Sequence, residues 1–227
     1  INRDTMSEVR LIQDDGTGAA TAELQLCTAH WYGGNAGQSC ANTVESISKL
    51  FGGLKIDGYY AIPMDEIPKL NHSVGGVTVT LLEDFQHIDR QMKKGETLAL
   101  SDEQAYHYIH DRYGVGDEKN TSRMKRQQQY MEAFFTKAKE KAKSDKAYVS
   151  QLFRKFEQTA TTNLTAKKIS GLTNRLIKGT QKGFFEIQGT SKIGKALGDG
   201  IDHAEFYPDK KSIIDVMTKI YGLKKRE

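Results

Sequence analysis

Short β-branched segments alternate with longer segments of helical periodicity, and this alternation constrains the fold more than any other feature of the chain. Val77–Leu81 is a β-branched run typical of a strand. The segment that starts at residue 120 instead places Tyr130 and Phe134 at helical spacing, with lysines on its other side from Lys137 onward. The pattern indicates a mixed sheet flanked by helices, and we therefore predict an α/β fold in a single domain over residues 1–227.

Capping and stop signals set several element boundaries. Ser101 and Gln104 form a capping box that opens a helix, and Asn42 and Gly52-Gly53 can begin and end another. Besides the long helix after residue 120, we expect helices over residues 21–30, 42–51, 65–71, 101–110, 146–158 and 164–178, with a last one ending at Gly222. Strands are expected over residues 59–64, 77–81, 184–188 and 204–207.

The composition excludes several classes of protein. The 227 residues are 37% hydrophobic with 21 glycines and only 3 prolines, which argues against disordered, collagen-like and proline-rich chains. No apolar stretch approaches the roughly 20 residues that a membrane-crossing helix needs. A net charge of +4 is too small to indicate a nucleic-acid partner.

Positive charge is concentrated between Arg123 and Lys155. This stretch contains ten basic residues and three acidic ones, a surplus of seven positive charges. We interpret this run as the solvated face of helices, and an anionic partner or a membrane surface is the alternative. The basic residues are Arg123, Lys125, Arg126, Lys137, Lys139, Lys141, Lys143, Lys146, Arg154 and Lys155, and the acidic ones are Glu132, Glu140 and Asp145.

The two cysteines, Cys27 and Cys40, flank a glycine-rich turn over residues 33–37. A disulfide between them is sterically easy and would stabilise the fold by about 3 kcal/mol through loop closure. Such a bridge would suit an extracytoplasmic protein, and two buried thiols are the alternative.

Arginines around a polar, glycine-broken loop are the strongest candidates for chemistry. The loop covers residues 111–119 and contains Arg112, and Asn120 or Thr121 can cap the helix that follows. Backbone amides and the positive end of a helix favour an anion there.

The first turns of that helix carry Arg123, Arg126 and Gln127, with Arg123 and Gln127 on one face. Guanidinium groups bind phosphate oxygens in pairs, so the pattern indicates a phosphate or pyrophosphate site. The alternative is ordinary ion pairing of these arginines with nearby acidic residues, namely Asp111, Asp117 and Glu118.

Other residues give weaker signals. Arg3-Asp4 follows what resembles a cut strand and can bring a second cation and a carboxylate to a sheet edge, or form only a surface pair. No P-loop, nucleophile elbow, zincin motif or paired C-x-x-C occurs, and none of the histidines has metal-ligand company.

Several motifs in this order resemble the LytR-CpsA-Psr family. They are Arg3-Asp4-Thr5-Met6, Val74-Gly75-Gly76-Val77 followed by Asp84-Phe85, Arg112, and Asn120-Thr121-Ser122-Arg123-Met124-Lys125-Arg126-Gln127. The resemblance covers residues 1 to about 137, and Glu205-Phe206-Tyr207 is similar to the end of the family's domain.

This resemblance implies a three-layer α/β/α sandwich and a cell-envelope phosphotransferase. Family members take a glycan, such as teichoic acid or capsule, from a polyprenyl-pyrophosphate carrier and attach it to a peptidoglycan hydroxyl as a phosphodiester, using Mg²⁺. The implied partners are the lipid-linked glycan, peptidoglycan and the membrane, with no nucleic acid. The implied location is extracytoplasmic, anchored to the cell membrane and facing the wall, with the polyprenyl tail buried among core helices.

The resemblance also assigns roles to residues. Arg3, Asp4 and Arg112 are the expected catalytic residues: Arg3 would stabilise the transition state or leaving group, and Asp4 would orient Arg3 or help to deprotonate the acceptor. The expected pyrophosphate-binding residues are Arg112, Arg123, Gln127, Arg126 and His110.

The chain departs from the family pattern at three points. His110 stands where the family has an arginine, and Asn120 where an acidic residue is common. The two family aspartates that hold magnesium would precede residue 1, so the metal ligands are unknown, and we expect residues 1–227 to lack the N-terminal strands and the membrane anchor. His110 and Asn120 support an alternative, a non-catalytic envelope protein that binds polyprenyl phosphate or glycan. A transcriptional regulator is a further alternative, but no helix shows a base-reading pattern.

Overall fold

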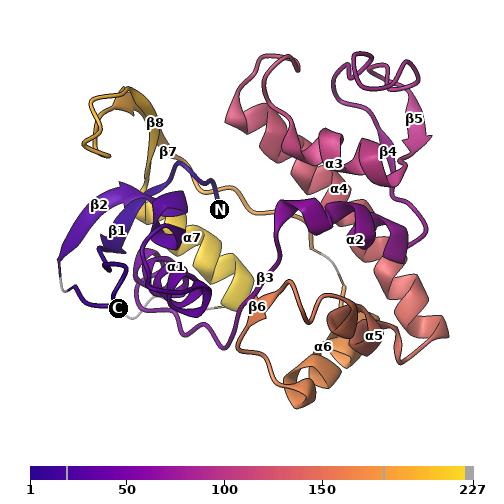
Figure 1. Ribbon diagram of the computed structural model, residues 1–227, viewed down its shortest axis with the longest axis horizontal. Coiled ribbons are helices and arrows are strands. Elements are labelled where there is room, and N and C mark those ends of the chain that lie inside the picture. The colour runs from indigo at the N-terminus through magenta and orange to yellow at the C-terminus, as the bar shows by residue number, and fades with distance from the viewer. Residues whose placement is uncertain (19, 181, 223–227) are drawn as a thin grey trace. The chain divides into compact units, whose positions relative to one another are not determined.

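The computed structural model describes residues 1–18, 20–180 and 182–222. The chain divides into two compact units, each assembled from segments that are distant in the sequence (Figure 1). The first unit comprises Ile1–Ala61, Thr161–Asn163 and Phe185–Glu227, and the second comprises Ile62–Ala160 and Leu164–Phe184. The single domain over residues 1–227 stays a prediction.

Short antiparallel strand pairs, two α-helices and a 3-10 helix make up the described part of the first unit. Their bounds are β1 Met6–Arg10, β2 Thr21–Gln25, the 3-10 helix η1 Leu26–His30, α1 Ala36–Leu50, β3 Tyr60–Ala61, β6 Thr161–Thr162, β7 Gly189–Gly194, β8 His203–Pro208 and α7 Lys210–Tyr221. The pairs are β1 with β2, β3 with β6, and β7 with β8.

The helix predicted over residues 21–30 is wrong in its first half. Residues 21–25 form β2, which pairs with β1 from Met6–Gln25 to Arg10–Thr21. Ladder hydrogen bonds to β1 outweigh the helical preference of the local sequence. Only Leu26–His30 is helical, as one short 3-10 turn.

The α/β class is confirmed, although the strands are less connected than the predicted central sheet. Each sheet in the described part of the chain has two strands. A parallel bridge between Thr5 and Phe206 joins the β1 side to β8, where the Phe206 amide donates to the Asp4 carbonyl at 2.8 Å. This bridge is the parallel pairing among the described strands, because the four ladders are antiparallel.

Helix α1 begins six residues before the predicted cap. Asn35 is its N-cap and accepts a hydrogen bond from the Gln38 amide. Asn42 is buried inside the helix, where its side-chain amide donates to the carbonyls of Arg10 and Ala29, each at 2.9 Å. Asn42 thus ties α1 to β1 and η1 instead of starting the helix.

The predicted disulfide between Cys27 and Cys40 is wrong, because both thiols are free. Cys27 lies in η1, and its sulfur accepts a hydrogen bond from Arg3 Nη2 at 3.6 Å. Cys40 is buried in α1, and this burial raises the pKa of its thiol. The two sulfurs therefore have different surroundings.

Helices dominate the second unit. Its elements are the 3-10 helix η2 Met64–Glu66, α2 Ile67–Ser73, β4 Thr78–Thr80, β5 Thr97–Ala99, α3 Asp102–His110, α4 Asn120–Ser144, α5 Tyr148–Lys155 and α6 Ala166–Lys178. The strand predicted over residues 59–64 shrinks to Tyr60–Ala61, and the one predicted over residues 184–188 is displaced to Gly189–Gly194.

One buried amide links four parts of the second unit's core. Asn71 donates to the Leu100 carbonyl at 3.0 Å and to Asp102 Oδ1 at 2.9 Å. Its oxygen accepts from the Val77 amide at 2.9 Å and from the Tyr130 hydroxyl at 3.2 Å. Because every polar atom of this side chain is satisfied, Asn71 holds α2, β4, α3 and α4 in register.

Candidate functional site

The glycine-broken loop lies between α3 and α4, as predicted. Ser101 and Gln104 form the predicted capping box, and α3 ends at His110. The cap predicted at Asn120 or Thr121 is wrong: Lys119 is the N-cap of α4, and no side chain caps it. Amides in the first turn of a helix without a side-chain cap can bind an anion, and the positive end of the helix dipole favours one.

The loop is held by its own side chains. Val115 is buried in the core of the second unit, and Glu118 adopts a left-handed backbone with φ of 57°. Glu118 Oε1 accepts a hydrogen bond from the Gly114 amide at 2.8 Å, and Asp117 Oδ1 accepts one from the Lys119 amide at 3.0 Å. Asp117 also accepts a hydrogen bond from the Ser122 side chain, so these two carboxylates hold the loop and the start of α4.

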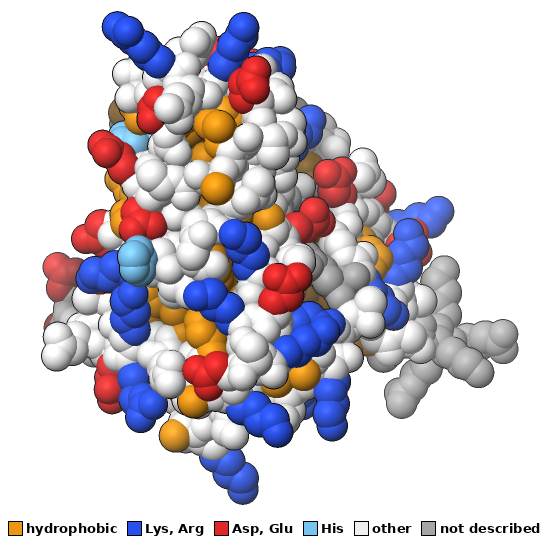
Figure 2. Space-filling model, turned by 90° about the vertical axis from the view of Figure 1, so that its right-hand side faces the viewer, with side chains coloured by type: hydrophobic (Ala, Val, Ile, Leu, Met, Phe, Trp, Pro, Cys, Tyr) orange, Lys and Arg blue, Asp and Glu red, His pale blue; other side chains and the backbone are white. Residues whose placement is uncertain are grey.

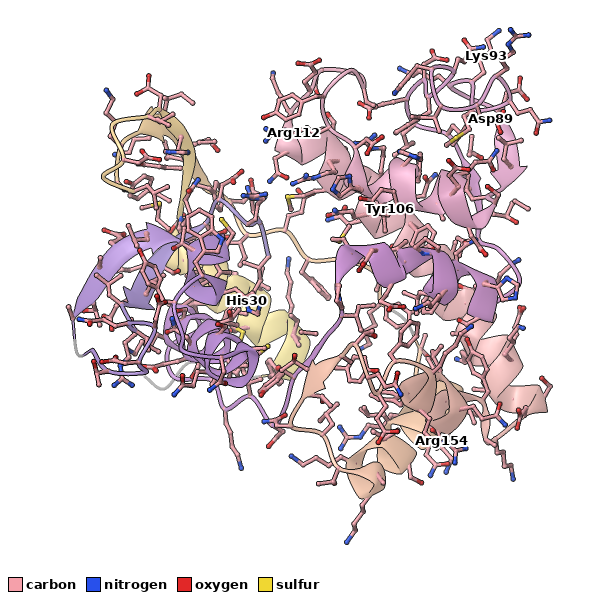
Figure 3. The ribbon with its side chains drawn as sticks, viewed as in Figure 1. His30, Asp89, Lys93, Tyr106, Arg112 and Arg154 are labelled. Atoms are coloured by element: carbon pink, nitrogen blue, oxygen red, sulfur yellow. The ribbon has the colours of Figure 1, made fainter. Side chains whose placement is uncertain are left out.

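Arg112 stands at the start of this loop (Figure 3). Its guanidinium lies 4.4 Å from the ring centroid of Tyr113 and donates to the Tyr113 hydroxyl. No carboxylate in residues 1–18, 20–180 and 182–222 forms an ion pair with Arg112. The alternative of ordinary ion pairing therefore does not hold for Arg112, whose charge remains available to an anion.

Arg126 has a different role from the one predicted. Its side chain is 1% exposed, and Nη1 lies 3.2 Å from Glu83 Oε2. The guanidinium carbon is 4.9 Å from the ring centroid of Phe85, and Nη2 donates to the Asp111 carbonyl at 2.5 Å. Burial lowers the pKa of Arg126, an effect that Glu83 opposes most strongly. The assignment of Arg126 to direct pyrophosphate binding is thus wrong, because this guanidinium lies in the core and supports the loop from beneath.

Arg123 and Gln127 lie on α4 as predicted, but Gln127 has a partner within the protein. Gln127 Nε2 donates to the Ile109 carbonyl at 3.0 Å and so holds the last turn of α3. Arg123 is half-buried, and its Nη2 donates to Asn120 Oδ1 at 2.8 Å. Asn120, where the resemblance expects an acidic residue, thus orients Arg123. The pyrophosphate roles of Arg123 and Gln127 stay predictions.

His110 belongs to a small cluster around Asp111. Nδ1 of His110 lies 3.0 Å from Asp111 Oδ1, and Nδ1 of His107 lies 2.7 Å from Asp111 Oδ2. Burial raises the pKa of Asp111, but its hydrogen bonds to His110 and His107 outweigh that effect and leave the pKa below its ordinary value. The His110 ring also stacks on Tyr106, one helical turn earlier, with ring centroids 4.8 Å apart. His110 is therefore held in place with part of its ring exposed.

Arg3 and Asp4 belong to the first unit. Arg3 Nε lies 3.6 Å from Asp4 Oδ1, and the two side chains are 48% and 13% exposed. The Asp4 carbonyl takes part in the bridge to β8, which fixes the backbone at this point. Asp4 is thus placed to orient Arg3, and the catalytic roles of both stay predictions.

Magnesium ligands are not found among the described residues. No group of three or more His, Cys, Asp or Glu side chains in this part of the chain is placed to hold a metal ion. The use of Mg²⁺, which the resemblance implies, stays a prediction. In the same part of the chain, no helix has the length and apolar character for crossing a bilayer.

Sequence reasoning missed the residues that surround Arg126. Glu83 supplies the counter-charge, while Phe85 and Tyr108 supply aromatic faces at 4.9 and 5.9 Å. A signal was present, because Arg126, Tyr130 and Phe134 follow one another at intervals of four on α4. A basic residue on such an apolar stripe indicates a buried cation that needs an acidic partner.

Comparison with solved structures supports the fold. TagV of B. subtilis shares 21% identity at a TM-score of 0.69, covering 98% of this chain and 80% of TagV. Protein gbs0355 of Streptococcus agalactiae shares 22% identity at a TM-score of 0.71, covering 99% and 74% of the two chains. TagT bound to LI-WTA shares 18% identity at a TM-score of 0.64, covering 98% and 76%. The comparison with curated proteins gave no match.

Sequence comparison agrees with the structural likeness. The family model described as the LytR_cpsA_psr family matches residues 1–220, nearly the whole chain. The chain therefore belongs to the LytR_cpsA_psr family, whose members attach glycopolymers to the bacterial cell wall.

Proposed function

We propose that this protein is an extracytoplasmic phosphotransferase that moves a glycan from a polyprenyl-pyrophosphate carrier to a hydroxyl of peptidoglycan. The observation that carries the proposal is Arg112, whose guanidinium forms no ion pair with a carboxylate in the described part of the chain, at the start of a loop that leads into a helix without a side-chain cap. Family membership supports a role in glycopolymer attachment. The structure of TagT bound to LI-WTA, which we interpret as a lipid-linked wall teichoic acid, supports a lipid-linked glycan as substrate.

The chemistry of a phosphoanhydride suits these residues. In the proposed step, the acceptor oxygen bonds to the phosphorus that carries the glycan, and the anhydride P–O bond breaks. Polyprenyl phosphate leaves with the bond's electron pair, and the hydroxyl proton passes to a base. Negative charge spreads over the phosphoryl oxygens in the transition state, so preorganised cations accelerate the reaction mainly by electrostatics and positioning.

Each residue then has a defined task. Arg112 and Arg123 would hold the pyrophosphate oxygens, and the exposed part of the His110 ring can hydrogen-bond a further oxygen. Arg3 would stabilise the leaving group, oriented by the ion pair with Asp4 at 3.6 Å. Gln127 has one amide hydrogen bond to α3 and would offer the rest of its amide to the phosphate.

Magnesium remains an expectation from the family resemblance. When bound, it would neutralise phosphoryl charge. Because the described residues offer no ligand group for it, no step above runs through the metal.

The test is transfer of glycan by the purified protein from a polyprenyl-pyrophosphate glycan to peptidoglycan, in the presence of Mg²⁺. We expect Arg112→Ala and Arg123→Ala each to slow release of polyprenyl phosphate by about 100-fold or more, as loss of a transition-state donor does. Arg90→Ala, at an exposed arginine of the same unit, is the matched control and should leave the rate unchanged. Circular dichroism verifies that all three variants fold.

Three results would contradict the proposal. Wild-type rates in both Arg112→Ala and Arg123→Ala would remove these residues from the reaction. A stable complex with the lipid-linked glycan and no turnover would indicate the non-catalytic binder. Salt-sensitive binding to duplex DNA without transfer would indicate a regulator of transcription.

A further inference from the structure

A hollow of about 510 Å³ lies in the second unit, at the far end of α4 from the arginine loop. The end of α2, the last turns of α4 and one face of α5 line it. Its volume is in the range of sites that bind small organic ligands. None of its lining residues belongs to the site described above, so the hollow would bind a ligand through other side chains.

Two lysines place positive charge at this hollow. Lys141 on α4 and Lys155 on α5 both line it, and neither forms an ion pair within the described residues. Lys155 is close enough to Glu66 to help lower the pKa of that carboxyl, after the larger effect of Lys69. Figure 2 shows Lys and Arg side chains gathered on the lower part of one face of the molecule. The hollow is therefore suited to an anionic group.

The rest of the lining can recognise hydroxyl groups. Tyr148 is 9% exposed, its hydroxyl lies 3.3 Å from Ser73 Oγ, and its burial raises the pKa of the phenol, which therefore stays protonated. Gln151 adds an amide, and Asp145 adds a carboxylate whose Oδ1 accepts the Ala147 amide at 2.8 Å. A carboxylate disfavours a bare phosphate ion, whereas it accepts hydrogen bonds from a polyol.

We propose that this hollow binds a phosphate-bearing sugar, with Lys141 and Lys155 on the phosphate and with Asp145, Gln151 and Tyr148 on the sugar. A membrane surface fits less well, because anionic phospholipid headgroups would be repelled by the Asp145 carboxylate beside the lysines. The side chain of Leu152 gives the lining one apolar surface, against which a sugar ring can pack.

The hollow would serve a distant part of the substrate. Arg123 and Lys141 are on one continuous helix, about 27 Å apart at about 1.5 Å per residue. Under the proposed function, a phosphate-bearing sugar so far from the pyrophosphate would belong to a later repeat unit of a long anionic glycan. This placement rests on the proposed function, whereas binding of a sugar phosphate at the hollow does not.

Binding is tested without turnover, with α-D-glucose 1-phosphate as the probe and amide shifts of Tyr148 and Gln151 as the NMR readout. We expect the double variant Lys141→Gln/Lys155→Gln to raise the Kd by about tenfold, equivalent to about 1.4 kcal/mol. The matched control Lys143→Gln/Lys146→Gln removes the same charge from exposed positions outside the lining and should change the Kd less than twofold. Glucose and inorganic phosphate, each alone, should bind more weakly than the probe.

Other outcomes overturn the proposal. Equal weakening by the two double variants would mean that overall charge, not the hollow, attracts the probe. Absence of shifts, with phosphatidylglycerol vesicles bound through Lys141 and Lys155, would make this face a lipid surface.

A transfer assay separates this proposal from the proposed function. With a long glycan on the carrier, Lys141→Gln/Lys155→Gln should raise KM and leave kcat unchanged, and with a single sugar it should change neither. If Arg112→Ala and Arg123→Ala keep full transfer while the hollow still binds the probe, the proposed function fails and the sugar-phosphate site stands. An unchanged KM for the long glycan would refute the link between the hollow and the substrate.

Discussion

Removing the counter-charge of Arg126 should destabilise the second unit strongly. Glu83→Ala leaves a guanidinium that is 1% exposed without the carboxylate now 3.2 Å from its Nη1. The Asp111 carbonyl and the ring of Phe85 would remain as its partners. Removing an exposed acidic residue costs little stability, because water solvates any cation near it.

The expected magnitude follows from burial. Breaking a buried ion pair by removing one partner costs about 3–5 kcal/mol, and the aromatic faces beside Arg126 retain about 1 kcal/mol through cation–π attraction. We therefore expect Glu83→Ala to lower the free energy of unfolding by about 3 kcal/mol. At about 2–4 °C per kcal/mol for a chain of this length, Tm should fall by about 6–12 °C.

Urea unfolding and calorimetry measure this effect, and two further variants test its cause. The double variant Glu83→Leu/Arg126→Met replaces both charges with apolar groups of similar size and should stay within about 1 kcal/mol of the wild type. Glu96→Ala, at an exposed residue of the same unit, is the control and should be neutral. The reasoning is refuted if Glu83→Ala is neutral, or if the double variant is as unstable as the single one.

Two more predictions concern the same loop. Gly116 has φ of 56°, and a Cβ there would lie 2.0 Å from Glu83 Oε1, so Gly116→Ala should cost about 2–3 kcal/mol of stability. Gly114→Ala, with φ of 74° and no atom within 4 Å of its Cβ, should cost only about 1 kcal/mol, and equal losses in the two variants would contradict this account. Because hydrogen bonds hold the pKa of Asp111 below its ordinary 3.8, its carboxylate stabilises the fold above that pH, and this stabilisation is lost as pH falls through the lower, folded-state pKa. Unfolding midpoints measured between pH 7 and 2 should therefore fall more steeply for the wild type than for Asp111→Asn, and parallel curves would refute the assignment.

Local signals in the sequence located most helices of the second unit. The capping box at Ser101 sets the start of α3, and Thr165 caps α6 within the predicted range of residues 164–178. In the first unit, Gly222 ends α7 in a left-handed conformation with φ of 64°, as its place after the apolar stripe predicts. These boundaries depend on residues within one turn of each other, so a local pattern is sufficient to find them.

Strand pairing was harder to predict, because a strand takes its register from its partner and not from its own periodicity. Residues 21–25 resemble a helix until β1 is placed beside them, and β8 meets the N-terminal segment from about 200 residues away through the bridge between Thr5 and Phe206. The strand β7 lies after the predicted range because its position is fixed by pairing with β8, from Gly189–Pro208 to Gly194–His203. Cross-strand contacts of this kind leave little trace in local periodicity.

The candidate site shows a further limit of sequence reasoning, because neighbouring arginines on one helix have opposite environments. Arg123 is half-buried near the loop, whereas Arg126 is enclosed by Glu83 and aromatic rings. The difference arises from helical phase, since Arg126 lies on the stripe of Tyr130 and Phe134, and a three-residue step moves a side chain off that stripe. Spacing identified both as cations near a loop, but only the packing shows which one can meet a ligand.

The different environments of Arg123 and Arg126 have a consequence for the mechanism. Arg126 holds the Asp111 carbonyl and Gln127 holds the Ile109 carbonyl, so α4 fixes the end of α3 and the first residue of the loop without any ligand present. A site that is already ordered has less conformational entropy to lose when an anion binds, and its cations need less reorganisation during the reaction. The cost is a buried guanidinium that needs Glu83 as its counter-charge. Charge at the loop alone would therefore be insufficient for function, because Arg112 directly follows the residue whose carbonyl the buried Arg126 holds, and Arg126 in turn needs Glu83.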